Sequence, residues 1–182
     1  MLLNNKVGGK SVKPYQPDGL WEINSMTYKM DTTDAIYRRS LYVIVKRSVP
    51  NPTLGTFDAP TRSSCIVRRQ RTNTPLQALV TLNDPTYVEA SRVMGEQMAR
   101  QKQVSEAIEW AYRQLTGKRP NENEVKLLDK LYTTQYETFK ANSTKTKGWL
   151  KTGLKKIDTT LEPAQVAAYA VVANTILNSY AT

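Results

Sequence analysis

The chain has 182 residues, of which 40% are hydrophobic and 23% are charged, so it can bury a core of its own. It contains one cysteine, Cys65, and no histidine, which excludes an internal disulfide, a c-type haem attachment motif and any Ser-His or Cys-His catalytic pair. Its formal net charge of +10 favours negatively charged partners: nucleic acid, acidic polysaccharide, anionic lipid or an acidic protein.

The N-terminal part is predicted to be largely irregular. Residues 1–30 are rich in Gly, Pro, Asn and Ser and are expected to form an extended arm with turns. Thr33 begins a segment in which helical spacing predicts a helix, although its β-branched run LYVIV also suits a buried strand. The apolar positions with this spacing are Tyr37, Leu41, Ile44 and Val45. Prolines and a glycine within 50–55 end the segment, and an irregular stretch is expected up to about Gln70.

Two consecutive helices with proline at their first position are predicted next. Thr74-Pro75-Leu76-Gln77 has the pattern of a capping box, in which a threonine caps the helix and a glutamine three residues later bonds back. Asn83-Asp84-Pro85 ends this helix and starts another, with Asp84 as its N-cap. The expected inward face of the second helix comprises Tyr87, Ser91, Met94 and Met98, and the methionines are interpreted as core residues.

Three further helices complete the prediction. One begins at Ser105 and ends at Gly117, a second begins at Asn121 with Glu124 in the capping-box position, and the last begins at Pro163. Their predicted buried residues are Ile108, Tyr112 and Leu115, then Val125, Leu128, Tyr132, Tyr136 and Phe139, then Val166, Ala170, Ala173, Leu177 and Tyr180.

The fold class predicted from these elements is all-α, with about five or six helices and a long extended N-terminal arm and loop. The chain is treated as one helical domain, 1–182, with an arm at 1–30 and a helical body at 31–140. Residues 141–160 are expected to be a mobile Lys-rich loop, and residues 161–182 the C-terminal helix.

Positive charge is concentrated in two segments. Residues 38–71 carry eight basic side chains against one acid, Asp58, and residues 140–156 carry six lysines and no acid. Such clusters are typical of surfaces that attract polyanions, and they also occur as ordinary solvated surface. Both interpretations remain open for the two segments.

The candidate site lies in the first of these segments, on irregular chain just before a predicted helix. Its residues are Asp58, Arg62, Arg68, Arg69, Arg71 and Asn73. Clustered arginines offer paired hydrogen bonds to carboxylate, sulfate or phosphate, and a helix N-terminus adds to anion affinity. The alternatives are that the arginines satisfy backbone carbonyls, that Asp58 pairs with one of them and that Asn73 caps its own turn. Cys65 is expected to be a small buried apolar residue rather than a reactive thiol.

Several strings along the chain together resemble one known family. They are GGKSVKPYQPDGLW, YRRSLYVIVKRSVPNP, TFDAPTRSSCIVRRQRTNTPLQALVTLNDPTYVEASRVM, LTGKRPNENEV and the closing VVANTILN. They are similar to the domain of unknown function numbered 1553, also called the planctomycete-surface type. The resemblance implies the C-terminal part of a large exported bacterial protein, often with a planctomycete-type cytochrome c domain and a companion domain upstream. It supplies no catalytic residues.

The function expected from the residues and this resemblance is a non-catalytic C-terminal helical module that packs on upstream domains and presents an arginine-lined surface to an acidic polysaccharide or an acidic partner domain. It would act in the periplasm or at the cell surface, as part of a longer protein whose export signal lies outside this segment. No P-loop, EF-hand loop or GxGxxG motif occurs, so no cofactor and no metal are expected here. The alternatives are part of a hydrolase or oxidoreductase in polysaccharide use, and a nucleic-acid binder, which the absence of a recognition-helix motif disfavours. No membrane span is expected.

Overall fold

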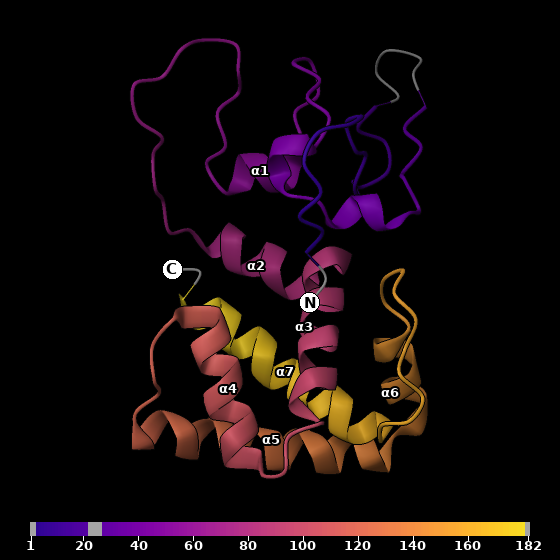
Figure 1. The fold of residues 1–182 in the computed structure, drawn as a ribbon, viewed down its shortest axis with the longest axis vertical. Coiled ribbons are helices and arrows are strands. Elements are labelled where there is room, and N and C mark those ends of the chain that lie inside the picture. Colours follow the sequence, from indigo (N-terminus) through magenta and orange to yellow (C-terminus); the bar gives the residue numbers. More distant parts are fainter. Residues whose placement is uncertain (1–2, 22–26, 181–182) are drawn as a thin grey trace. The chain divides into compact units, whose positions relative to one another are not determined.

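A computed structural model describes residues 3–21 and 27–180, apart from the side chain of Tyr180 (Figure 1). Within these ranges the chain is 54% helical, with seven α-helices and no β-strand, so the all-α prediction is confirmed. The chain divides into two compact units, Leu2–Gln77 and Ala78–Thr182, where the sequence predicted a single domain. No helix in the described ranges is both long enough and apolar enough to cross a membrane.

The first unit folds its extended arm around the side chain of Arg38. The guanidinium donates hydrogen bonds to the backbone carbonyls of Lys6 and Lys10 at 3.1 and 3.0 Å, and to that of Gly8. The carbonyls converge because Gly8 turns the chain with φ of 76°, a conformation that costs a glycine little. The guanidinium carbon also lies 3.6 Å from the centre of the Tyr42 ring, in a cation–π contact. One side chain therefore orders a segment that has no regular structure of its own.

The helix predicted from Thr33 onward is wrong. The structure has two short 3-10 helices there, η2 (Asp34–Tyr37) and η3 (Ser40–Tyr42), joined by extended residues. Two members of the predicted inward stripe are exposed, Leu41 at 68% and Val45 at 42%. The helical spacing of the apolar residues therefore does not correspond to a buried helix face.

The physical reason is that this segment bonds to the arm instead of to itself. The Val12 amide donates to the carbonyl of Tyr42 at 2.8 Å, and the Ile44 amide donates to the carbonyl of Val12 at 2.9 Å. These bonds form an isolated parallel bridge between Val12 and Val43. Backbone groups that pair with a distant segment are no longer available for the ladder of a helix.

The helical unit is built from elements whose ends match the sequence signals closely. The helices are α2 (Pro75–Asn83), α3 (Pro85–Met98), α4 (Val104–Thr116), α5 (Glu122–Ala141), α6 (Ser143–Leu150) and α7 (Pro163–Tyr180). The carboxylate of Asp84 caps α3, and Asn121 and Glu124 form the predicted capping box of α5. Gly117 ends α4 with φ of 72°. The start of α4 differs by one residue from the predicted Ser105, and α6 was not predicted.

The predicted core positions are correct in the second unit. The buried ones are Ser91, Met98, Ile108, Tyr112, Leu128, Tyr132, Phe139, Val166, Ala170 and Ala173. The half-buried ones are Tyr87, Met94, Leu115, Val125, Tyr136 and Leu177, while the side chain of Tyr180 lies outside the described residues. These residues gather around α7, which contacts α3, α4, α5 and α6 (Figure 1).

Close packing of α3 against α7 requires a glycine at position 95. A Cβ atom placed on Gly95 would lie 2.7 Å from the carbonyl oxygen of Val166 and 2.8 Å from the backbone nitrogen of Ala170. Both atoms belong to the backbone of α7 and cannot rotate away. The two helices therefore approach more closely than any side chain at this position would allow.

The segment predicted to be a mobile loop at 141–160 contains α6, and the residues after α6 are fixed to α3. Arg92, which is fully buried, donates to the carbonyl of Lys155 at 2.7 Å and forms an ion pair with Glu96. The Lys155 amide donates to the carboxylate of Glu89 at 2.6 Å. Lysines dominate the composition of this segment, but its backbone is bound by a buried charged cluster.

We predict that Gly95→Ala destabilises the protein by about 1–3 kcal/mol, because α3 must move away from α7 to relieve the overlap. Gly148→Ala is the matched control, since a Cβ there meets nothing within 4 Å and α6 gains a better helix former. Urea unfolding followed by circular dichroism measures both variants. Equal midpoints for the two variants would contradict the close-packing argument.

Candidate anion-binding loop

The candidate site residues lie on one long excursion between α1 (Pro52–Thr56) and α2, here called the arginine loop (residues 58–73; Figure 1). The sequence predicted an irregular stretch from Pro50 to about Gln70, and within it only α1 is helical. Helix α1 forms because Asn51 accepts a hydrogen bond from the Leu54 amide at 3.0 Å and Pro52 occupies the first helical position. The chain then leaves α1 at Asp58, whose φ is 58°.

The two ends of the arginine loop are joined by Asp58 and Thr72. The Asp58 carboxylate accepts the Thr72 amide at 2.8 Å and also the Thr72 hydroxyl at 2.8 Å. We call this closure, where residues 57–58 meet residues 69–72, the neck. A loop whose ends are held together in this way keeps its shape without a core beneath it.

Arg69 belongs to the neck. Its Nε donates to the carbonyl oxygen of Asp58 at 2.9 Å, and its second nitrogen donates to the carbonyl of Phe57. Arg69 thereby binds two carbonyls just after α1, in the way that the structural interpretation of the arginines expected. Arg69 is therefore a structural residue of the loop.

Gln77, in the first turn of α2, is hydrogen-bonded to Thr72 of the neck. Its side chain is 3% exposed. It donates to the carbonyl of Thr56 at 2.9 Å and to the hydroxyl of Thr72 at 3.1 Å, and it accepts the Thr74 amide at 3.2 Å. The capping box predicted from the sequence is present, and the same glutamine also links α1 to the end of the loop.

The hydrogen bonds at the neck lower the pKa of Asp58. The largest cause is the bond from the Thr72 amide, followed by the bond from the Thr72 hydroxyl and the positive charge of Arg69. The carboxylate is therefore ionised and acts as a hydrogen-bond acceptor throughout the physiological range. This environment is the opposite of the one that raises the pKa of a catalytic acid.

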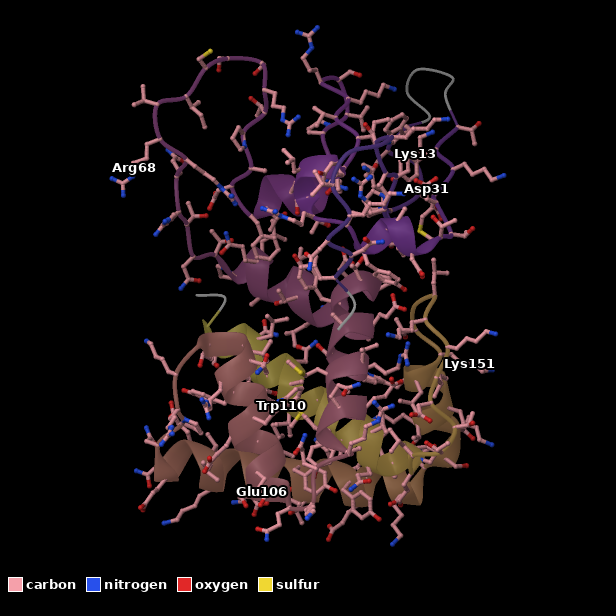
Figure 2. All side chains as sticks on the ribbon, in the orientation of Figure 1. Lys13, Asp31, Arg68, Glu106, Trp110 and Lys151 are labelled. Carbon is pink, nitrogen blue, oxygen red and sulfur yellow. The ribbon has the colours of Figure 1, made fainter. Side chains whose placement is uncertain are left out.

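Three arginines of the loop have no partner. Arg62, Arg68 and Arg71 make no hydrogen bond or ion pair within residues 3–21 and 27–180, and all three are exposed. Figure 2 shows the Arg68 side chain extending away from the loop. An open hollow of about 520 Å³ adjoins Arg68 and Arg71 but not Arg62; it is lined by Arg68, Arg69, Gln70, Arg71 and Thr72. The structure thus separates the predicted arginines into one that builds the neck and three that face solvent.

The remaining predictions for the loop have mixed outcomes. Cys65 is exposed, so the prediction that it is buried is wrong, because the loop has no core of its own at that point. Asn73 is exposed and makes no hydrogen bond in the described part of the chain, so it does not cap its turn. Asp58 accepts from Thr72 rather than from an arginine side chain. Sequence reasoning missed Thr72 as the neck partner, since a threonine in irregular chain gives no signal of its role.

The described residues also show no clustering of metal ligands. Within residues 3–21 and 27–180, no three side chains of the Cys, Asp and Glu types come close enough together to hold a metal ion. Asp58 is the only acid between Asp34 and Asp84, so the arginine loop offers no second carboxylate for acid–base work. The exposed guanidinium groups of the loop have the chemistry to bind carboxylate, sulfate or phosphate.

One comparison with known proteins identifies a family. A family model, PSD1, described as a protein of unknown function (DUF1553), matches residues 1–132. The match contains the whole arginine loop, and the similarity at the closing VVANTILN lies beyond it. No curated protein and no solved structure matches the chain.

We predict that Thr72→Val raises the pKa of Asp58 toward its usual value near ~3.9, because the hydroxyl bond is lost and the neck loosens. In the unaltered protein the Asp58 carboxylate stays ionised, and keeps its bonds to Thr72, at every pH above its lowered pKa. These bonds are lost only as the pH falls through that lowered pKa. Carboxyl NMR titration measures this pKa. Thr61→Val is the control, since Thr61 bonds only to Ser63. An ordinary pKa for Asp58 in the unaltered protein would refute the neck.

Proposed function

The chain belongs to the family of proteins of unknown function described as PSD1 (DUF1553), and we propose that this segment is a non-catalytic module that binds clustered anionic groups through the arginine loop. The observation that carries the proposal is that one arginine of the loop is bonded within the chain and three are not. Arg69 is bound within the neck, whereas Arg62, Arg68 and Arg71 are unpaired within the described ranges, and Arg68 and Arg71 line an open hollow. Such groups bind sulfate, phosphate or carboxylate through paired, charge-assisted hydrogen bonds.

The environment of Asp58 supports a binding role over a hydrolytic one. A hydrolase at this loop needs a carboxyl group with a raised pKa, or a pair of carboxylates at a suitable distance. Asp58 has a lowered pKa and both of its oxygens are engaged by Thr72. No observation in the loop favours the hydrolase or oxidoreductase alternative.

The proposal extends to the setting of the module. In this proposal the segment is the C-terminal part of an exported bacterial protein, in the periplasm or at the cell surface. Its partners are the upstream domains of that protein, a cytochrome c domain among them, and an acidic polysaccharide, and it holds no cofactor itself. The support for an anionic partner is the net charge of +10 and the absence of any acid between residues 59 and 83.

We predict that the protein binds a sulfated polysaccharide such as heparin, and that the triple variant Arg62→Gln/Arg68→Gln/Arg71→Gln weakens this binding about tenfold or more. The reason is the loss of three charge-assisted contacts on one loop. Isothermal titration in a salt series from low ionic strength to ~0.15 M measures the affinity and its salt dependence.

The matched control removes the same charge elsewhere. Lys102, Lys126 and Lys130 are exposed on the helical unit, and their replacement by glutamine lowers the net charge equally. Equal losses for the two triple variants would mean general charge attraction and would overturn the loop as the site. Duplex DNA is the comparator for the nucleic-acid alternative, which requires tighter binding of DNA than of heparin at every salt concentration.

A further inference from the structure

The tip of the arginine loop presents apolar side chains to solvent. Ile66 is 51% exposed and Val67 is 108% exposed, so no residue of the described part of the chain packs against Val67. Cys65 beside them is also exposed. Scattered apolar residues on a surface are ordinary, but here adjacent ones stand at the end of a loop that is closed at its neck and shielded by no other residue.

The unpaired arginines flank this apolar tip on both sides. Arg62 precedes it by three residues, and Arg68 and Arg71 follow it. The sequence between residues 59 and 83 contains no acidic side chain to repel an anion. A short apolar tip with guanidinium groups behind it matches the layering of a lipid surface, where phosphate headgroups lie above the hydrocarbon.

We propose that the arginine loop docks on an anionic lipid surface, with Ile66 and Val67 entering the boundary between headgroups and acyl chains while Arg62, Arg68 and Arg71 contact lipid phosphates. The inference rests on the proposed anion-binding function and names the surface that carries the anions. The neck supports it, because Asp58, Thr72 and Gln77 fix the base from which the tip projects.

Two features favour a lipid surface as the partner of the apolar tip. Residues 58–74 contain no aromatic side chain, and aromatic faces are what protein loops use to stack on the flat sides of rings. A partner protein would need a pocket shaped for Ile66 and Val67 within an interface of roughly 800 Å² on each side. A bilayer accepts an apolar tip of any shape and gains affinity from each cation near its surface.

The test is flotation of the full chain with phosphatidylcholine vesicles that contain about 30% phosphatidylserine, and with pure phosphatidylcholine vesicles, at ~0.15 M salt. We expect binding to the anionic vesicles alone. Ile66→Ser/Val67→Ser should weaken it about tenfold or more, while binding to heparin stays within about twofold. The control Val7→Ser/Leu127→Ser removes side chains that are 84% and 68% exposed elsewhere, and should bind vesicles as the unaltered protein does.

The single cysteine offers a second, independent measurement. Cys65 is exposed and adjoins Ile66, so a polarity-sensitive fluorophore attached to it reports the surroundings of the tip. Its emission should shift to the blue with anionic vesicles and stay unchanged with heparin. Vesicle binding without a blue shift, or without any loss in the Ile66→Ser/Val67→Ser variant, would overturn insertion of the tip.

The outcomes also separate this inference from the function on which it rests. Binding to heparin without binding to vesicles would overturn the lipid surface and leave the anion-binding module standing. Binding to neither would overturn both. The Arg62→Gln/Arg68→Gln/Arg71→Gln variant should lose both ligands, whereas the tip variant should lose only the vesicles.

Discussion

Hydrogen bonds from arginine side chains to backbone carbonyls hold this protein together where helices do not. Arg38 gathers three carbonyls of the glycine turn in the N-terminal arm, Arg69 binds two at the neck of the arginine loop, and Arg92 binds one in the segment after α6. Each guanidinium supplies charge-assisted hydrogen bonds to the carbonyls of irregular chain, in exposed positions in the arm and at the neck and in a partly buried position after α6. Long irregular segments are stable here because a rigid, multivalent donor lies beside each of them.

The arginines that make no such bond to a carbonyl form a second group. Within the described ranges, Arg62, Arg68 and Arg71 bind no carbonyl and no carboxylate, although Arg69 between them does. These three unpaired cations, on a loop whose ends are joined by the neck, are the observation on which the proposed anion binding rests.

The sequence predicted what depends on neighbours in the chain and missed what depends on distant contacts. The caps at Asp84, Asn121 and Gly117 are local, and so the helices they bound were predicted closely. The segment after Thr33 has the apolar spacing of a helix, but its backbone pairs with the arm thirty residues earlier. The Lys-rich segment after α6 is ordered by Arg92, and no property of its own composition reveals that contact. At the candidate site the sequence located the arginines. It did not show that Arg69 is bonded within the neck while Arg62, Arg68 and Arg71 face solvent.

Backbone conformation supports the same division within the loop. Asp58 and Arg62 are the non-glycine residues with positive φ among the described residues, at 58° and 59°, a conformation that costs about 1–2 kcal/mol outside glycine. At Asp58 the cost is offset, because its carboxylate closes the neck. At Arg62 no hydrogen bond offsets it, and a glycine would adopt the same turn without strain. Under the proposed function, an anion bound by Arg62 outside the chain would account for this conformation.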